Sequence, residues 1–147
     1  MTVRNYDTKY GTIHVSTPGP YRAYGNLSVY VQTAQRHVLL QGPALRAFKA
    51  AEQRITPKRW KKKGRTRHIL ITGVGYRDYA LQKQLWQSDP GRYANPDYSM
   101  HCEGLAVDVD QSQGAFRLNQ IKKALLLEGW HYGVSGEPWH TSYTVTG

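Results

Sequence analysis

The sequence lacks several features, and each absence excludes a class of protein. Its 147 residues include one cysteine, Cys102, so no disulfide can form within the chain and no zinc site can consist of cysteines alone. Disulfide-stapled secreted scaffolds are thereby excluded. No run approaches the roughly 18 apolar residues that a membrane-spanning helix needs. The first residues also lack the apolar segment of a secretion signal, so we expect synthesis in the cytoplasm.

Acidic residues are scarce as well. There are 10 Asp and Glu against 20 Lys and Arg, which gives a formal net charge of +10. Such a surplus favours encounters with polyanions: nucleic acid, acidic membrane surfaces or anionic cell-wall polymers. The content of hydrophobic residues, 39%, and of aromatic residues, 12%, is too high for a wholly disordered chain. The length suits one domain with its own core.

Apolar spacing predicts three helices. The first covers residues 43–55, because Pro43 suits a first helical turn and apolar residues follow at intervals of three and four. The second begins after Asp78, a typical N-cap, carries Leu81 and Leu85 on one face and ends before residues 88–91. The third covers residues 116–128 and ends at Gly129.

The remaining segments predict short strands and loops. Strands are expected at residues 68–72, 105–109, 130–133 and 139–145. Residues 58–67 contain seven Lys and Arg and predict an exposed basic loop. The first 36 residues predict an arm of loops and short strands that packs onto the domain through its aromatic side chains. These are Tyr6, Tyr10, Tyr21, Tyr24 and Tyr30.

Candidate metal ligands concentrate in residues 99–110, Ser-Met-His-Cys-Glu-Gly-Leu-Ala-Val-Asp-Val-Asp. In a straight strand His101 and Asp108 would lie roughly 23 Å apart, so ligation of one ion requires the chain to double back, with Gly104 as the pivot. After the pivot, Asp108 and Asp110 share one face of the expected strand. Either aspartate is a possible ligand, and Cys102 is a conceivable thiolate ligand or nucleophile, although a packed thiol is the simpler interpretation.

A second group of polar residues is Glu137-Pro138-Trp139-His140. Pro138 favours an extended backbone at Glu137, so this is not the helical arrangement of many zinc peptidases. Two imidazoles and one carboxylate make a good catalytic zinc set with a fourth position for water, and Glu137 would then act as general base. Trp139 is interpreted as a core residue.

Together these residues resemble a known family. The pattern Ser-x-His-x-x-Gly-x-Ala-x-Asp, followed by Glu-Pro-Trp-His and Tyr143, is similar to the VanY-type zinc D-alanyl-D-alanine carboxypeptidases and related phage endolysin peptidases. Upstream, Gly75-Tyr76-Arg77 and Gln82 look like the family's Gly-Tyr-Arg-Ser-x-x-x-Gln element. The resemblance covers residues 38–145, within one predicted domain of residues 1–147 in which residues 1–36 form the arm.

The resemblance implies roles for individual residues. It makes His101, Asp108 and His140 the ligands of one Zn²⁺ and Glu137 the base. It gives Arg77 the task of holding substrate and stabilising the developing oxyanion, a task that suits a guanidinium. It also places Ser99 and Gln82 along the substrate cleft. The implied fold is α+β, a small antiparallel sheet with helices packed on one side, as in hedgehog and D,D-peptidase domains.

The resemblance also implies a substrate class. We expect hydrolysis of peptidoglycan stem peptides by a D,D-carboxypeptidase of phage endolysin type, acting on the cell wall after release through a phage lysis system. An endopeptidase that cuts L-Ala-D-Glu or cross-bridge bonds is the alternative. Position 78 is Asp where the family commonly has Ser, and Ser142 stands where many members have Arg; these departures bear on substrate choice more than on metal binding. A non-enzymatic module that binds nucleic acid or wall polymers through residues 58–67 is the alternative of another class.

Overall fold

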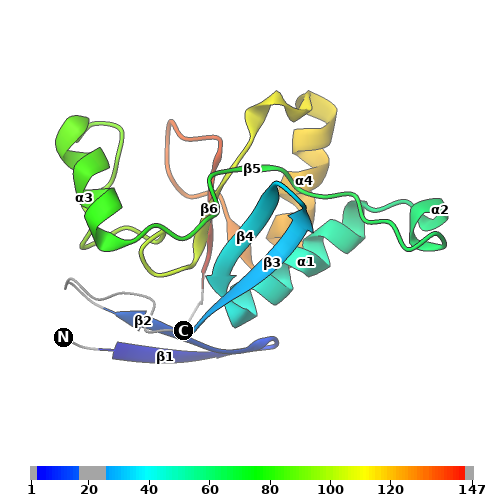
Figure 1. The fold of residues 1–147 in the computed structure, drawn as a ribbon, viewed down its shortest axis with the longest axis horizontal. Coiled ribbons are helices and arrows are strands. Elements are labelled where there is room, and N and C mark those ends of the chain that lie inside the picture. Colours follow the sequence, from blue (N-terminus) through cyan, green and yellow to red (C-terminus); the bar gives the residue numbers. More distant parts are fainter. Residues whose placement is uncertain (1–2, 17–25, 145–147) are drawn as a thin grey trace.

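A four-stranded antiparallel sheet forms the centre of the protein. The computed structural model describes residues 3–16 and 26–144 (Figure 1). The strand order is β5-β6-β8-β7. The strands are β5 (Ile71–Thr72), β6 (Ala106–Val109), β7 (Trp130–His131) and β8 (His140–Tyr143). In this register Asp108 is paired with both Thr72 and His140, so polar residues from three strands meet at the same level of the sheet.

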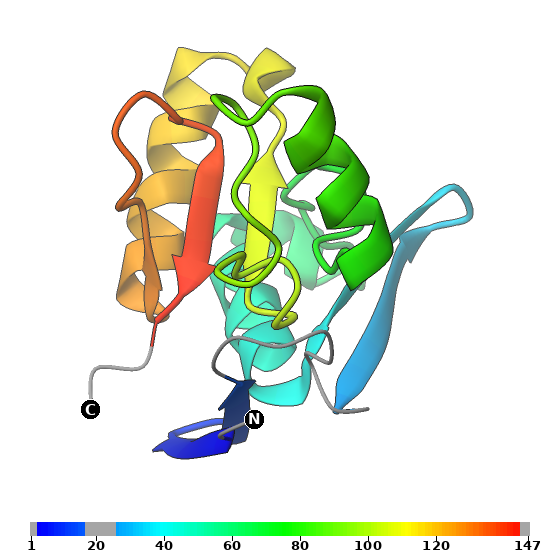
Figure 2. The same cartoon turned by 90° about the vertical axis from the view of Figure 1, so that its left-hand side faces the viewer.

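Two long helices cover one face of this sheet. These are α1 (Gly42–Ile55) and α4 (Ala115–Leu127), which pack against each other and bury Phe48 and Trp130 completely. The third, α3 (Tyr79–Ser88), lies on the other side of β6, as Figure 2 shows. The predicted α+β fold with a small antiparallel sheet is therefore confirmed, but α3 departs from the expected packing of the helices on one side of the sheet. No helix among the described residues is long and apolar enough to cross a bilayer.

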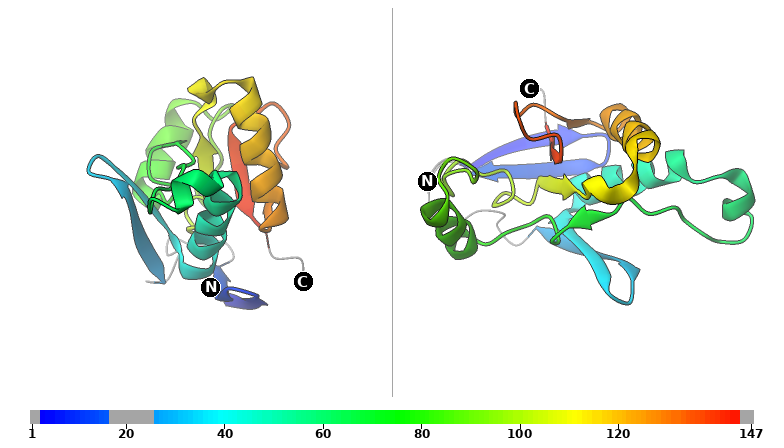
Figure 3. Two further views of the ribbon diagram at one scale, coloured as in Figure 1. Left: turned by 90° about the vertical axis from the view of Figure 1, so that its right-hand side faces the viewer. Right: turned by 90° about the horizontal axis from the view of Figure 1, so that it is seen from above.

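Two hairpins precede α1. They are formed by β1 (Val3–Thr8) with β2 (Gly11–Ser16), and by β3 (Leu27–Thr33) with β4 (Arg36–Gln41). Figure 3 shows both as separate ribbons at the edges of the molecule. Tyr6, Tyr10 and Tyr30 are partly buried against the core, whereas Tyr21 and Tyr24 lie outside the described residues.

The strand expected at residues 68–72 is shorter than predicted. Only Ile71 and Thr72 pair with β6. The Leu70 carbonyl still accepts from the Asp110 amide at 2.9 Å, but the amides of Ile69 and Leu70 donate to side chains rather than to a strand. The Ile69 amide donates to Glu52 Oε2 at 2.9 Å, and the Leu70 amide donates to Gln113 Oε1 at 3.2 Å. Gln113 belongs to a short 3₁₀ turn, Gln111–Gln113. Periodicity alone does not reveal such side-chain partners.

The predicted basic loop is not entirely a loop. Residues Lys58–Lys61 form a helical turn, α2, after which the chain continues irregularly to β5.

The prediction for α3 also needs correction. Asp78 does cap it, accepting from the Leu81 amide at 2.7 Å, but Leu81 is 44% exposed and Gln82 is the buried residue. Helix α3 therefore turns an amide, not a leucine stripe, toward the protein.

Candidate metal centre

The loop from Ser99 to Gly104 returns the chain toward the sheet. Its turns are closed by backbone bonds such as Gly104 N–H to His101 O at 3.1 Å. Gly104 has φ +71°, and a Cβ there would lie 2.7 Å from Leu27 Cδ2 and 3.3 Å from the Gln41 amide nitrogen. The left-handed φ and the nearby Gln41 backbone both favour glycine. The predicted pivot thus brings His101 back beside Asp108.

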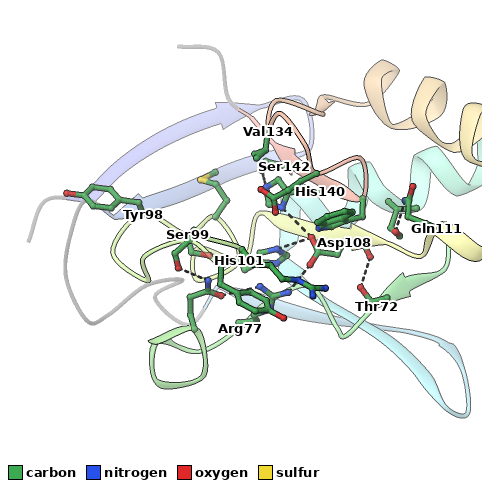
Figure 4. A pocket seen from close by; sticks show the side chains of 18 residues that line it. Thr72, Arg77, Tyr98, Ser99, His101, Asp108, Gln111, Val134, His140 and Ser142 are labelled. Carbon is green, nitrogen blue, oxygen red and sulfur yellow. Dashed lines mark hydrogen bonds and ion pairs between the residues drawn. The ribbon is translucent and has the colours of Figure 1, made fainter. Parts of the chain in front are cut away.

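Three candidate ligands converge on one point, as Figure 4 shows. His101 Nε2 lies 3.2 Å from Asp108 Oδ1, and His140 Nδ1 lies 3.3 Å from the same oxygen. One ligand atom from each residue lies within 4.8 Å of the other two. All three side chains are buried or nearly so. The side chains come from the loop before β6, from β6 and from the first residue of β8.

Neighbouring groups fix the orientation of both imidazoles. His101 Nδ1 lies 2.8 Å from the carbonyl oxygen of Gly75, and its Nε2 faces Asp108. His140 Nε2 lies 3.1 Å from Ser142 Oγ, and its Nδ1 faces Asp108. Outer partners of this kind hold metal-binding histidines in the required tautomer.

The spacing of these atoms fits a tetrahedral zinc ion. Zinc bonds to nitrogen and oxygen of about 2.0–2.1 Å place neighbouring ligand atoms about 3.3 Å apart. The two distances from Asp108 Oδ1, 3.2 and 3.3 Å, match this value. Two imidazoles and one carboxylate also leave the fourth position free, as catalytic zinc requires. The residues present therefore suit zinc by their chemistry, and both spacings measured from Asp108 agree with it, while the ligand atoms of all three residues lie within 4.8 Å of one another.

Asp108 is held in its charged form. Burial raises the pKa of this carboxyl, but hydrogen bonds with His101 and His140 and the charges of His101 and Arg77 outweigh burial and hold the pKa well below its usual range. Arg77 Nη2 donates to Asp108 Oδ2 at 2.8 Å. Each carboxylate oxygen thus has its own task, Oδ1 toward the histidines and Oδ2 toward Arg77.

Arg77 and Gln82 are joined by a hydrogen bond between their side chains. Arg77 Nη1 donates to Gln82 Oε1 at 3.2 Å, and Gln82 Nε2 donates to the Ala94 carbonyl at 2.8 Å. Gln82 is 1% exposed, so it fastens α3 to the guanidinium and to the loop at residues 89–98. A guanidinium has five N–H donors, and Asp108 and Gln82 take two of them. The others remain for a further oxygen.

A cavity of about 680 Å³ lies over the candidate ligands. Every site residue that the sequence predicted lines it. These are Arg77, Gln82, Ser99, His101, Asp108, Glu137 and His140. Glu137 is partly exposed, and a turn closed by His140 N–H to Glu137 O at 3.2 Å holds it next to His140. The ligand and base roles remain predictions, but the residues do share one cavity.

The alternative ligands do not join this cluster. Asp110 caps the 3₁₀ turn, accepting from the Ser112 amide at 2.9 Å and from its hydroxyl at 2.6 Å. Cys102 is fully buried, with Sγ 4.0 Å from the Asp78 carbonyl oxygen. Trp139 was expected in the core, yet it is partly exposed and lines the cavity. Its place beside the turn at Glu137 makes it a wall of the cavity.

Sequence reasoning did not place several residues at the cavity, although it noted Ser142 as a departure from the family pattern. Ser142 lies two positions after His140 on the same strand, and that period-two spacing was the available signal. Arg92, Tyr93 and Tyr98 line the cavity from the loop at residues 89–98. No periodicity marks that loop, so no local signal was available for them.

Comparisons with known proteins rest on structure alone. No family profile matches the sequence, and no curated protein matches it. Two of the solved structures that match this chain share the fold. One is the vancomycin-resistance D,D-pentapeptidase VanY from a VanB-type cassette in complex with Zn(II). It has a TM-score of 0.55 and 17% sequence identity, and the match covers 88% of this chain and 85% of that chain. The other is the LD-carboxypeptidase LdcB. It has a TM-score of 0.54 and 20% sequence identity, and the match covers 98% of this chain and 84% of that chain. At these identities the likeness shows the fold.

Proposed function

We propose that this protein is a zinc peptidase that removes the terminal D-alanine from peptidoglycan stem peptides. One observation carries the proposal: ligand atoms of two imidazoles and a carboxylate lie within 4.8 Å of one another, beside Glu137, in a cavity large enough for a short peptide. The fold is shared with VanY, which was solved with Zn(II), and with LdcB, whose structure concerns peptidoglycan recognition. That likeness supports the choice of metal and of substrate class.

The residues around the cavity suit amide hydrolysis. His101, Asp108 and His140 would hold the ion, which when bound supplies Lewis acidity that activates water and polarises a carbonyl. Glu137 accepts the proton of the attacking water at its carboxylate and passes it to the leaving amine. Arg77, with donors left after binding Asp108 and Gln82, stabilises negative charge on the carbonyl oxygen.

A cationic residue of the cavity favours a carboxypeptidase over an endopeptidase. Only an exopeptidase of this kind must bind a free C-terminal carboxylate next to the scissile bond. Among the residues that line the cavity, Arg77 and Arg92 carry a permanent positive charge, and Arg77 is already bound to Asp108. Arg92 is exposed, and within the described part of the chain no carboxylate pairs with it. We assign it to the substrate carboxylate.

Mass spectrometry of defined muropeptides tests the proposal. The protein is incubated with a pentapeptide muropeptide and with a cross-linked dimer, with zinc and with a chelator. We expect loss of one alanine from the pentapeptide, abolished by the chelator and by Glu137→Gln. Internal cleavage would instead make the protein an endopeptidase. If neither substrate changes while one zinc is bound per chain, the peptidase proposal fails for this substrate class.

A matched variant controls for folding in this assay. Glu137→Gln preserves the size of the side chain and removes its charge, and Glu137 is not one of the three clustered ligands. It should therefore bind zinc as the original protein does. The phage origin and the release through a lysis system that the sequence resemblance implied remain predictions, which the same assay does not address.

A further inference from the structure

Residues 58–67 form a positively charged segment that takes no part in the candidate site. This segment is called the cationic arm, or simply the arm, below, and it is distinct from the N-terminal arm of residues 1–36. The cationic arm holds seven of the chain's 20 Lys and Arg within ten residues. No Asp or Glu occurs between Glu52 and Asp78, so the neighbouring sequence does not neutralise it. The basic residues are Lys58, Arg59, Lys61, Lys62, Lys63, Arg65 and Arg67.

The structure leaves this charge available. All seven basic residues are exposed except Arg67, which is partly exposed. Within the described residues, no carboxylate forms an ion pair with any of them, whereas nearby Arg54 is paired with Glu128 at 2.8 Å. Burial lowers the pKa of Arg67, and the charges of Arg117 and Arg59 lower it further. Arg117 of α4 therefore extends the same positive surface, which costs self-repulsion unless an anion binds.

The arm has a fixed shape rather than being a loose run of lysines. Residues 58–61 form α2, and backbone bonds from Gly64 to Lys61 and from Arg65 to Trp60 close the following turn, at 3.0 and 2.9 Å. The guanidiniums of Arg65 and Arg67 lie over the Trp60 ring, 4.8 and 4.6 Å from its centre. Thr56 Oγ1 accepts from the Arg67 amide at 3.0 Å and ties the end of the arm to α1.

The arm lies far from the cavity. In Figure 1 α2 is at one end of the long axis and α3, which borders the cavity, is at the other; the view from above in Figure 3 agrees. None of the arm residues lines the cavity. A polyanion bound to the arm therefore leaves the cavity open to substrate.

We propose that the arm is a docking surface for phosphodiester-linked polyol polymers of the bacterial cell wall. The proposal rests on the proposed function, since the substrate lies in the same wall and a docked arm would keep the enzyme close to it. Regularly spaced phosphates complement a row of exposed ammonium and guanidinium groups without any need for base recognition.

The structure of the arm disfavours nucleic acid as its partner. Readout of bases in a groove uses a helix or a strand ribbon of adequate length, whereas α2 has four residues. Single-stranded nucleic acid needs open aromatic surfaces for stacking, and Trp60 is already covered by two guanidiniums. What remains is recognition of phosphate charge.

Co-sedimentation with purified cell walls tests the docking surface. The arm variant carries Lys58→Gln, Lys61→Gln, Lys62→Gln and Lys63→Gln. The control variant loses the same charge at four exposed positions outside the arm and the cavity: Arg36→Gln, Lys49→Gln, Lys83→Gln and Lys122→Gln. Each protein is titrated against walls that carry phosphate polymers, walls stripped of them and duplex DNA at equal phosphate concentration, over a salt series.

We expect the arm variant to bind intact walls at least about tenfold more weakly than the control variant, with a shallower dependence on salt. Stripped walls should bind the original protein as weakly as intact walls bind the arm variant. The proposal would be overturned if the arm variant and the control variant bound intact walls equally. It would also be overturned if the original protein bound stripped walls as tightly as intact walls. Tighter binding to DNA than to intact walls would make the arm a nucleic-acid surface instead.

Activity on a small soluble pentapeptide separates this proposal from the proposed function. The arm variant should hydrolyse that peptide at the original rate, since the arm is remote from the cavity. If wall binding depends on the arm while no peptide is hydrolysed by any variant, the docking surface stands and the peptidase proposal falls. If the peptide is hydrolysed at the original rate and wall binding is the same in the arm variant as in the control variant, the peptidase proposal stands and the docking surface falls.

Discussion

At the scale of single residues, Asp108 organises the candidate site. Its two carboxylate oxygens receive the histidines on one side and Arg77 on the other. Strand pairing places it directly opposite His140, and the turn at Gly104 brings in His101. The chemistry that we propose then depends on two residues outside this set, Glu137 for proton transfer and Arg92 for the substrate carboxylate.

Glu137→Gln should separate catalysis from metal binding. Loss of a general base costs about 10²–10⁴-fold in rate, so we expect kcat to fall by that factor. The zinc content, measured by mass spectrometry of the purified protein, should stay at one per chain because the three clustered ligand atoms are unchanged. If the variant loses its zinc instead, Glu137 is a ligand and not the base.

Arg92→Gln should affect recognition of the substrate's end. Loss of a charge-assisted hydrogen bond of about 1.5–3 kcal/mol raises KM for a pentapeptide by about 10–100-fold, with a smaller change in kcat. The original protein should prefer the free acid to the same peptide with a C-terminal amide, and the variant should lose that preference. Lys83→Gln, an exposed change outside the cavity, serves as control. An unchanged preference in Arg92→Gln would remove the argument for a carboxypeptidase.

At the scale of elements, Glu52 joins three parts of the fold. It lies on α1, is 1% exposed and accepts hydrogen bonds from Gln32 Nε2 of β3 and from the Ile69 amide, both at 2.9 Å. The Tyr30 hydroxyl also donates to it, at 2.5 Å. Burial, followed by this contact with Glu52, raises the pKa of Tyr30. Helix, hairpin and the approach to β5 are thus held by one carboxylate.

Glu52→Gln should therefore destabilise the fold without touching the site. Hydrogen bonds to a charged group contribute about 1.5–3 kcal/mol, and the amide retains only part of that contribution. We expect the free energy of unfolding to fall by about 1–3 kcal/mol in a urea titration, with zinc content unchanged. Gln53→Ala, on the exposed side of the same helix, should change it by less than about 0.5 kcal/mol. Equal effects of the two changes would argue against the proposed role of Glu52.

The sequence predicted the local parts of the fold and of the site, but not their long-range partners. Apolar spacing located α1 and α4 nearly to the residue, and motif spacing selected His101, Asp108 and His140. Neither method detects contacts between distant segments, such as Arg77 to Asp108. The length of β5 depends on such a contact with Glu52, and the orientation of α3 depends on the contacts of Gln82. Both features were therefore predicted wrongly.

At the scale of the whole molecule, the candidate ligands join segments that are far apart in the chain. His101 precedes β6, Asp108 lies within it, and His140 begins β8 after the whole of α4. An ion bound by all three would bind the folded chain and not the unfolded one, so it would stabilise the fold by mass action. Removing the ion should therefore lower the melting temperature of the entire domain.

Calorimetry with and without metal tests this coupling. At a free zinc concentration about 100 times its Kd, the stabilisation is about 2.7 kcal/mol, which for a domain of this size raises Tm by about 5–10 °C. A chelator should reverse the shift, and His140→Ala should abolish it, since the variant leaves a ligand pair in place of the set of three. Glu137→Gln should retain it in full. A Tm that zinc leaves unchanged in the original protein would contradict the metal centre itself, whatever the outcome of the activity assays.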